Sequence, residues 1–264
     1  MKFSICCSGS KGNCFVLSHG DCCLVIDCGS TKRRIENSFK EIGVKMDDVD
    51  ACLITHHHND HISQVKLFER KPIYSAQPLD GMDVQELISL IPFEIKGIRI
   101  IPFALSHDAE KTMGFVFEAD KEKLVYVTDT GYLPQAYYPL LQDADYIIME
   151  SNHDIEMLME SSRPHFLKSR IYSDQGHLCN EDCAEVLDAI VTEKTKEIVL
   201  AHLSEEANTP QKALEASVTK LMNKKEKLHP QLTIMVAKQY EILQGGTEHE
   251  KKYLDFAHCL IGMV

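Results

Sequence analysis

Residues 55–61 read Thr-His-His-His-Asn-Asp-His and directly follow a run of four apolar residues. Side chains alternate along an extended chain, so His56 and His58 point to the same side and can hold one cation together. Asp60 and His61 lie beyond the expected strand end, where a turn lets them face a second cation. Imidazole and carboxylate ligands together suit zinc, manganese or iron. The stretch therefore predicts a site for a pair of metal ions at the end of a strand.

Three more residues of ligand type occur later, each directly after a short apolar run rich in β-branched residues. They are His107, Asp129 and His202. Strands deliver the residues that follow them to one edge of a sheet, so these side chains are expected near the His-rich stretch. The alternative interpretation is a solvated loop or a loose metal scavenger. That alternative predicts clustered histidines without partners elsewhere, and the three later residues argue against it.

The order of these residues resembles the metallo-β-lactamase-fold hydrolases, whose pattern is matched by His-x-His-x-Asp-His at 56–61 and by the three later residues. The resemblance spans residues 2–240. It implies an α/β (α+β) fold, a four-layer αββα sandwich, with two divalent ions in a cleft at one edge. The ions are expected to be zinc or manganese, with iron as a further option, because these ligands suit all three.

The resemblance also implies which residues hold each ion. The implied sets are His56, His58 and His107 for the first ion, Asp60, His61 and His202 for the second, and Asp129 as the bridge. Asp27, in Leu-Val-Ile-Asp-Cys-Gly at 24–29, resembles the early strand-ending Asp-x-Gly of these hydrolases. By this resemblance Asp27 supports the site from behind the ligands.

Four shorter segments narrow the resemblance to the YycJ (WalJ) type of bacterial proteins. They are Ser-Gly-Ser-Lys-Gly-Asn at 8–13, Glu-Ser-Asn-His-Asp at 150–154, Ser-Asp-Gln-Gly-His-Leu-Cys-Asn at 173–180 and Ala-His-Leu-Ser-Glu-Glu-Ala-Asn-Thr-Pro at 201–210. That type is regarded as a DNA exonuclease acting from 5′ ends. The resemblance therefore implies a dinuclear phosphodiesterase, in its most specific form a 5′ to 3′ exonuclease with DNA as substrate.

Two departures from better-known relatives leave the substrate open. Asp129 stands where the zinc β-lactamases carry Cys, which fits the phosphodiesterase and hydrolase branches. The stretch between Asp129 and His202 is too short for the large inserted domain of the cleavage-and-polyadenylation-type nucleases. Hydrolysis of a small phosphodiester, thioester or lactone is the alternative function. A fold retained only for binding would lack a ligand, whereas all seven positions are filled.

Candidates for proton transfer and substrate binding come from the same segments. Asp60 is a candidate base for the attacking water, and His177 is a candidate to assist the phosphate or leaving group. The candidate substrate-binding residues are Ser8, Asn13, Asn152, His153, Arg163, Lys168 and Arg170. A surface histidine in a Gly-flanked turn is the alternative for His177, and a solvated face is the alternative for the basic residues. For residues 8–13, a tight connection between strands is favoured over phosphate binding. For the segment with His153 and Asp154, a helix start with Asp154 near its N-cap is at least as well supported as a functional role.

Length and composition bound the organisation of the chain. With 264 residues and 44% hydrophobic content, the chain can form one sizeable domain, expected at 1–244, with a tail at 245–264 packed on it. The sequence has no apolar run long enough for a membrane span and no long apolar signal region at its start. We therefore expect a cytoplasmic protein without a membrane segment.

Charge and cysteine content add two further expectations. The formal net charge of −12 argues mildly against nucleic acid, because phosphate contacts need Lys and Arg, although the distribution of charge is more informative than its sum. Six of the ten cysteines fall within residues 6–28 and match no zinc-ribbon or iron–sulfur spacing. They are expected to be small buried hydrophobic residues in a reducing compartment.

Hydrophobic periodicity and turn residues predict two stacked β-rich halves with outer helices. Strands are predicted at 2–7, 14–18, 22–26, 51–55, 98–104, 114–118, 124–128, 146–149, 198–201 and 232–237. Helices are predicted at 31–42, 62–69, 83–90, 134–141, 180–191 and 210–222. The first of these helices places Ile35, Phe39 and Ile42 at helical spacing, with Gly43 as its stop.

Overall fold

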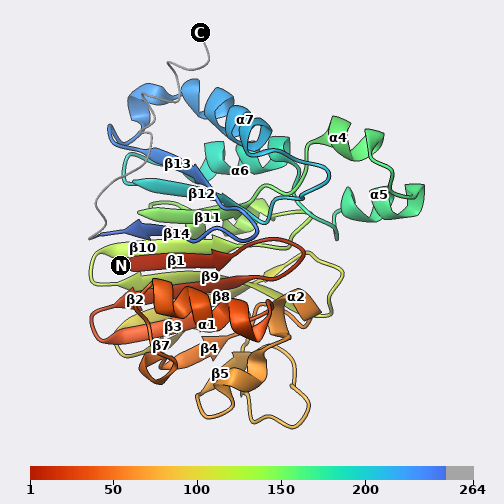
Figure 1. Cartoon of the computed structure of the whole chain (residues 1–264). Helices are drawn as coiled ribbons and strands as arrows, with labels where there is room; N and C mark the ends of the chain where they lie inside the picture. Colours follow the sequence, from red (N-terminus) through yellow and green to blue (C-terminus); the bar gives the residue numbers. More distant parts are fainter. Residues whose placement is uncertain (248–264) are drawn as a thin grey trace.

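The computed structural model describes residues 1–247, in which the strands form two seven-stranded sheets (Figure 1). The strand order is β14-β1-β2-β3-β4-β5-β6 in the first sheet and β13-β12-β11-β10-β9-β8-β7 in the second. The sheets lie face to face, and helices cover both outer surfaces. The predicted αββα sandwich is confirmed.

The first sheet comes mainly from the first third of the chain. Its strands are β1 (Lys2–Cys7), β2 (Cys14–His19), β3 (Cys22–Ile26), β4 (Ala51–Leu53), β5 (Ile73–Ser75), β6 (Gln85–Glu86) and β14 (Leu243–Gly246). Strand β3 is a continuous apolar run that is buried throughout, as expected for a strand covered on both faces. Strands β3, β4 and β5 are parallel neighbours, so their carboxyl ends reach the same edge.

The second sheet comes from the remainder of the chain. Its strands are β7 (Phe93–Ile95), β8 (Ile98–Leu105), β9 (Thr112–Ala119), β10 (Glu122–Val127), β11 (Tyr146–Glu150), β12 (Glu197–Ala201) and β13 (Thr233–Val236). Strands β10 to β13 run parallel to one another. Ligands of open parallel sheets bind at the carboxyl ends of such strands. The topology therefore gives both sheets an edge suited to a site.

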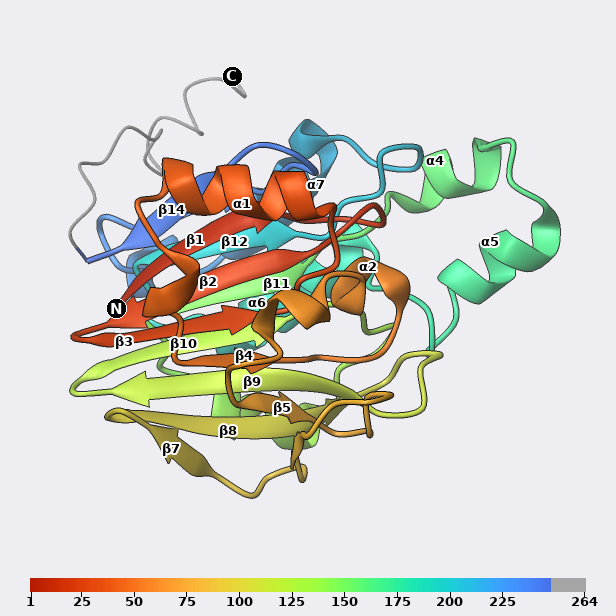
Figure 2. The same cartoon turned by 60° about the horizontal axis from the view of Figure 1, so that its bottom comes forward.

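Three apolar layers hold the sandwich together. Phe15 of the first sheet and Phe117 of the second belong to the layer between the sheets. Helix α1 (Lys32–Glu41) buries Ile35 and Phe39 against the outer face of the first sheet. The outer face of the second sheet is covered by α3 (Tyr138–Leu141), α6 (Asn180–Ile190) and α7 (Pro210–Met222). Figure 2 shows α1 and α6 on opposite outer faces.

The remaining helices are short. They are α2 (Asn59–Ile62), α4 (Ile155–Glu160), α5 (His165–Ile171) and the 3₁₀ helices Met46–Asp48, Val65–Phe68, Gln135–Tyr137 and Lys225–Lys227. In both overall views, α2, α4 and α5 lie at one end of the sandwich (Figures 1 and 2). That end also contains the predicted site.

Most predicted elements are confirmed within a residue or two, but the helix predicted at 83–90 is wrong. This segment contains β6, and Leu90 has a φ of 64°, which an α-helix does not allow. The segment carries the chain from one sheet to the other. Leu87 is buried between the sheets, whereas Ile88 is 52% exposed, so the apolar spacing does not reflect one buried helical face. The helix predicted at 62–69 is also wrong in its bounds, since α2 begins at Asn59 and is followed by a 3₁₀ helix.

Strand β14 crosses the predicted boundary at 244/245, because Gly245 and Gly246 pair with Phe3 and Lys2 of β1. The predicted division of the chain stays a prediction, and the packing of the tail beyond Thr247 lies outside the described residues. Within residues 1–247, no helix is long and apolar enough to cross a membrane.

The cysteines of the described part are buried and free of disulfides. Several lie in the apolar layer under α1. Burial, with the neighbouring Cys6, raises the pKa of Cys7 to about 12, so this thiol stays protonated at neutral pH. No candidate metal cluster within residues 1–247 includes a cysteine. These thiols behave as the predicted small hydrophobic residues.

Candidate metal centre

The predicted ligands lie at the carboxyl ends of strands from both sheets. The His-rich stretch follows β4, His107 follows β8, Asp129 follows β10 and His202 follows β12. Asp129 and His202 have φ values of 58° and 56°, and Asp27, after β3, has a φ of 60°. This left-handed conformation is uncommon outside glycine and is concentrated at functional sites. The backbone thus turns sharply where it presents these side chains.

The first predicted set of ligands, His56, His58 and His107, forms one cluster whose ligand atoms lie within 4.8 Å of one another. The Nδ1 of His107 lies 3.0 Å from the carbonyl oxygen of Gly176, which leaves Nε2 to face the site. That Nε2 lies 3.3 Å from Nδ1 of His58. Nδ1 of His58 and Nε2 of His107 are therefore the atoms placed to bind a shared ion.

The second predicted set, Asp60, His61 and His202, forms a cluster of the same tightness. Asp129 lies between the two sets. One of its carboxylate oxygens is 3.2 Å from Nε2 of His61, and the other is 3.8 Å from Nε2 of His107. This position is the one that a bridging carboxylate needs.

Unpartnered buried atoms test whether these residues fit metal ions. Nε2 of His56 and Nε2 of His202 are buried without a hydrogen-bond partner. Buried polar atoms are normally paired, so two such atoms in one group of ligand-type side chains call for an explanation. The opposite ring nitrogens are already held, Nδ1 of His56 by Thr55 at 3.1 Å and Nδ1 of His202 by Glu150 at 2.7 Å. The donor set fits two divalent ions.

Asp27 occupies the supporting position predicted for it. Its carboxylate lies 2.7 Å from Nδ1 of His61 and accepts hydrogen bonds from the backbone N–H and hydroxyl of Thr55. A carboxylate behind a ligating histidine fixes the tautomer and orientation of the ring. Asp27 therefore directs Nε2 of His61 toward Asp60 and Asp129.

Glu150 supports the other side of the site and is missing from the predicted set. It is fully buried at the end of β11 and lies 2.7 Å from Nδ1 of His202 and 2.9 Å from Nδ1 of His177. It also accepts hydrogen bonds from the backbone N–H groups of Thr130 and Leu178. It lies at a strand end, as Asp129 does, but its burial against two histidines is visible only in the fold.

Ser8 and Asn13 lie beneath the ligands rather than in an open cleft, being 4% and 1% exposed. The hydroxyl of Ser8 accepts a hydrogen bond from the backbone N–H of His202, and the side-chain amide of Asn13 lies 2.9 Å from Nε2 of His61. The turn at 8–13 is packed tightly against the His-rich stretch. A Cβ on neighbouring Gly29 would lie only 1.7 Å from the backbone oxygen of Asp60, so only glycine fits there.

A cleft of about 410 Å³ opens beside the ligands. It is lined by Ser10, His107, Asp108, Asn152, Arg163, Leu167, Arg170, Ile171, Gly176, His177, Ser204 and Glu206. Arg170 pairs with Asp108, whose carboxylate is 3.3 Å from Nε2 of His107. Arg163 pairs with Glu206 at 2.9 Å. Both arginines thus lie on the wall of the cleft next to the predicted metal ligands.

The other predicted substrate-binding residues lie elsewhere or are buried. Lys168 is not among the residues lining the cleft, and its ammonium group bonds the carbonyl oxygen of Met159. His153 is fully buried, and both of its ring nitrogens lack partners. Asn152 reaches the cleft while its side-chain amide donates to the carbonyl oxygen of His202 at 2.8 Å. His57 stands between two of the predicted ligands, but its Nε2 lies 2.9 Å from the hydroxyl of Ser75 instead.

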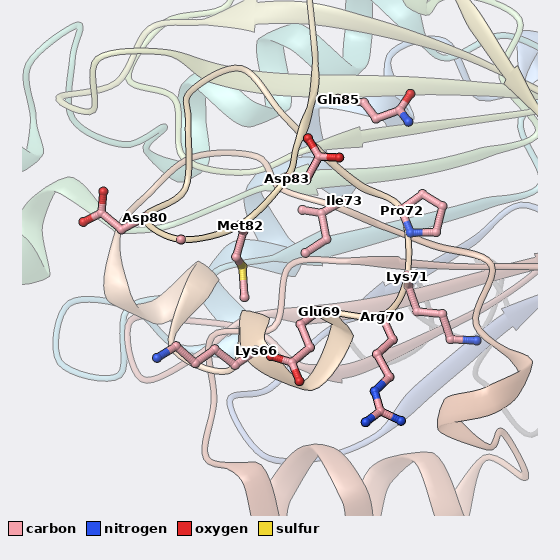
Figure 3. A pocket seen from close by; sticks show the side chains of 11 residues that line it. Lys66, Glu69, Arg70, Lys71, Pro72, Ile73, Asp80, Met82, Asp83 and Gln85 are labelled. Atoms are coloured by element: carbon pink, nitrogen blue, oxygen red, sulfur yellow. The ribbon is translucent and has the colours of Figure 1, made fainter.

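A second hollow, of about 800 Å³, has none of the predicted ligands in its lining (Figure 3). Its wall carries both basic and acidic side chains, among them Lys66, Arg70, Asp80 and Asp83. The smaller cleft is the better candidate for a substrate site, because the predicted ligand His107 is part of its lining.

Comparison with known proteins identifies the family. Sequence profiles named Metallo-beta-lactamase superfamily and Beta-lactamase superfamily domain match residues 8–76 and 66–203. The chain is 34% identical over 240 residues to exodeoxyribonuclease YycJ of Bacillus anthracis, covering 85% of this chain and 90% of that protein. It is 36% identical over 236 residues to exodeoxyribonuclease WalJ of Streptococcus pneumoniae, covering 83% and 88%. This chain belongs to the YycJ (WalJ) family.

Solved structures share the fold of this YycJ-family protein at lower sequence identity. The metallo-beta-lactamase fold protein YhfI from Bacillus subtilis matches with a TM-score of 0.68 at 17% identity, covering 92% of this chain and 98% of that chain. The short form of human tRNase Z matches with a TM-score of 0.62 at 16% identity, with the same coverage. The fold and family together make the YycJ-family chain a metal-dependent hydrolase.

Opposing electrostatic effects set the charge of the ligands in this YycJ-family site. Burial alone would lower the pKa of His61 and His202. Asp27 and Asp129 outweigh burial at His61 and raise its pKa well above its usual range, while Asp129 and Glu150 raise the pKa of His202 to about 9. Metal binding requires neutral imidazole, so a bound ion must displace these protons.

The raised histidine pKa values predict how the metal-free YycJ-family protein responds to pH. A histidine with a raised folded-state pKa stabilises the fold fully below its unfolded value of 6.5 and loses that contribution as pH rises through the folded value, here about 9. His202 alone corresponds to about 3 kcal/mol. We expect the unfolding free energy of EDTA-treated protein to fall between pH 6.5 and 9, as measured by urea denaturation.

The metal-loaded protein is the control for this pH prediction. Its histidines are neutral ligands at every pH in the window, so its curve should lack the part of the decline that the histidines cause. Cysteines of the unfolded chain, with a pKa of about 8.5, ionise within the window in both samples, so the readout is the difference between the two curves. Parallel pH curves for the metal-free and metal-loaded protein would contradict the assignment of the ring protons.

Proposed function

We propose that this protein is a dinuclear metal-dependent exonuclease that degrades DNA from 5′ to 3′ in the cytoplasm. The observation that carries the proposal is that seven side chains of ligand type meet at the carboxyl ends of strands from both sheets. Some of their buried atoms lack partners, and the cleft beside them is lined by two arginines. The names of the YycJ and WalJ relatives support DNA as the substrate.

The ligand set suits phosphodiester hydrolysis. Zinc or manganese ions held by the seven residues would supply an activated water near neutral pH and would offset the charge of the phosphodiester. Among the chain's own groups, Asp60 is placed to accept the proton of the attacking water. Burial would raise the pKa of Asp60, but the adjacent His61 outweighs it and lowers the pKa, so the carboxylate is ionised and able to accept a hydrogen bond.

His177 is placed to donate a proton to the leaving oxygen. It lines the cleft and is 20% exposed at its side chain, while its Nδ1 is held 2.9 Å from Glu150. Burial would raise the pKa of Glu150, but His177 and His202 outweigh it and lower that pKa to about 2, so Glu150 remains a carboxylate. With Nδ1 fixed by that carboxylate, Nε2 is the nitrogen that can reach substrate.

Arg163 and Arg170 are the proposed phosphate-binding residues of the cleft, because a guanidinium binds phosphate through two parallel hydrogen bonds. Asn152 is among the residues that line the cleft, whereas Lys168 is not and could contact only a phosphate outside it. Ser8 and Asn13 contribute by holding ligand segments, as their burial suggests. A substrate phosphate would have to compete with Asp108 for Arg170 and with Glu206 for Arg163.

The proposed function is tested with purified protein loaded with Mn²⁺ or Zn²⁺ and with DNA labelled at either end. We expect nucleotides to be released from the 5′ end, and a His58→Ala variant to release none. The same assay with RNA of the same sequence shows whether the protein prefers DNA or RNA. Metal-replete protein that degrades neither DNA nor RNA would contradict the nuclease proposal.

Hydrolysis of a small ester is the second candidate function. The net charge of −12 disfavours binding of a long polyanion, and a cleft of about 410 Å³ is large enough for one small ligand. A panel of cyclic phosphodiesters, thioesters and lactones, run beside the DNA assay with the same metal-loaded protein, separates the two candidates. Turnover confined to one of those compounds would favour this second function.

A further inference from the structure

Strands β3 and β4 run side by side, and the residues that follow them form a small buried group behind the predicted metal ligands (Figure 2). Asp27 directly follows β3, and its backbone N–H donates to the carbonyl oxygen of Leu53, the last residue of β4, at 2.9 Å. The backbone N–H of Thr55 donates to one carboxylate oxygen of Asp27, also at 2.9 Å. Asp27 and Thr55 are 0% and 1% exposed, so water does not compete for their side chains.

The hydroxyl of Thr55 has three polar neighbours. Its oxygen lies 2.8 Å from the second carboxylate oxygen of Asp27. It also lies 3.1 Å from Nδ1 of His56 and 3.1 Å from Nδ1 of His61. A carboxylate only accepts hydrogen bonds, so the single hydroxyl proton goes to Asp27. The hydroxyl oxygen is then left as an acceptor for a ring N–H.

The two histidine rings reach the carboxylate by different routes. Nδ1 of His61 lies 2.7 Å from Asp27, closer than it lies to the Thr55 hydroxyl, so its proton goes to the carboxylate directly. Nδ1 of His56 has the hydroxyl as its acceptor. With the proton of His56 on Nδ1, its Nε2 keeps a lone pair, and this is the nitrogen that is buried without a partner among residues 1–247. The hydrogen bond at one ring nitrogen determines which nitrogen can bind a metal.

We propose that Thr55 is a positioning residue of the metal centre, whose hydroxyl extends the hydrogen bonding of Asp27 to His56. One buried carboxylate then fixes a ligand of each ion, His61 directly and His56 through the hydroxyl. The inference rests on the proposed metal centre and not on the choice of DNA as substrate. Without the hydroxyl, the N–H of His56 would be buried with no acceptor. The ring would then no longer be held in the tautomer that binds metal.

The test is calorimetric titration of metal-free protein with Mn²⁺ in the absence of DNA, compared between the wild type and Thr55→Val. Valine keeps the branched shape of threonine and replaces the hydroxyl with a methyl group. Loss of such a supporting partner weakens metal binding by about 10- to 100-fold. We expect this loss at one of the two binding steps, while the other keeps its wild-type Kd. Thr55→Ser, which retains the hydroxyl, should bind both ions as the wild type does.

The His58→Ala background identifies the affected ion. That variant loses a ligand of the first set, so the ion that it still binds tightly is the one held by the second set. Adding Thr55→Val should leave the Kd of this ion unchanged, whereas adding Asp27→Asn should raise it. An unchanged Kd in the double variant with Thr55→Val also shows that the protein is folded.

Thr112→Val is the matched control for Thr55→Val. Thr112, the first residue of β9, is 2% exposed, and its hydroxyl is buried without a hydrogen-bond partner in the described part of the chain. The control should leave both Kd values unchanged. Wild-type affinity for both ions in Thr55→Val would overturn the inference, as would equal weakening in Thr55→Ser or Thr112→Val.

The same titration separates this inference from the proposed nuclease function. A wild type that binds two ions but releases no nucleotides from DNA would remove the nuclease function and leave the role of Thr55 to be decided by its variants. A wild type that binds no Mn²⁺ would remove the metal centre and this inference together.

Discussion

We expect the Asp129→Asn variant to hydrolyse DNA on the order of 10⁴-fold more slowly. The candidate ligands would act as one unit, so the remaining residues cannot replace the lost carboxylate. Asp129 lies 3.2 Å from His61 and 3.8 Å from His107, so its carboxylate is placed to join both ligand sets. An amide keeps the shape of the side chain but not its charge. The measurements are kcat on end-labelled DNA and metal content by elemental analysis. Metal content should fall together with activity.

Asp120→Asn is the matched control for Asp129→Asn. Asp120 has a similar left-handed backbone, with a φ of 52° against 58° for Asp129, and its side chain is 83% exposed beside His19. The control thus makes the same chemical change at the same backbone conformation, outside the site. It should retain activity and metal. Full metal content with near wild-type turnover in Asp129→Asn would contradict the bridging role.

The variant His177→Gln is expected to slow DNA hydrolysis by roughly 10²- to 10³-fold, the usual contribution of a positioned proton donor. DNA needs this donor because its leaving oxygen is a poor leaving group. An ester whose leaving group departs as p-nitrophenolate needs no proton at that oxygen, so its hydrolysis should change little. The rate on DNA divided by the rate on the p-nitrophenyl ester, compared between variant and wild type, measures the contribution of the proton transfer.

His19→Gln provides the control for His177→Gln. The side chain of His19 is 23% exposed and lies 2.9 Å from a carboxylate, as His177 does, but its partner is Asp120 on the surface. His19→Gln should leave both rates unchanged. An equal loss on both substrates in His177→Gln would point to disturbed metal binding or folding and would remove the assignment of His177 as proton donor.

The sequence made the clustering of the candidate ligands predictable, because most of them directly follow a short apolar strand. Asp27 was predictable in the same way, because it directly follows the apolar strand β3. Glu150 was missed, although it too ends a strand, because glutamate is common on surfaces and only the fold shows that this one is buried against two histidines. Strand ends can be read locally, whereas burial depends on partners distant in sequence.

The elements that failed or were missed depend on tertiary contacts. Residues 83–90 have helix-like apolar spacing, but the chain there crosses from one sheet to the other. Within this segment only Leu87 is buried. Helices α4 and α5 are short, and Phe166 on α5 is exposed, so the sequence has no full amphipathic period to reveal them. The cleft could not be predicted from the sequence either, because it depends on α5 bringing Arg170 to Asp108.

The pairing of β1 with β14 has a consequence for synthesis of the protein. β1 is flanked by β2 on one side and by β14 on the other, and the backbone N–H of Thr247 donates to the carbonyl oxygen of Met1. During translation, β14 leaves the ribosome only after every other strand of both sheets. One side of β1 therefore stays open on the nascent chain until then, and an unpaired strand edge can recruit another chain. Stalling or truncation before residue 243 should for this reason produce aggregation rather than a slightly shortened enzyme.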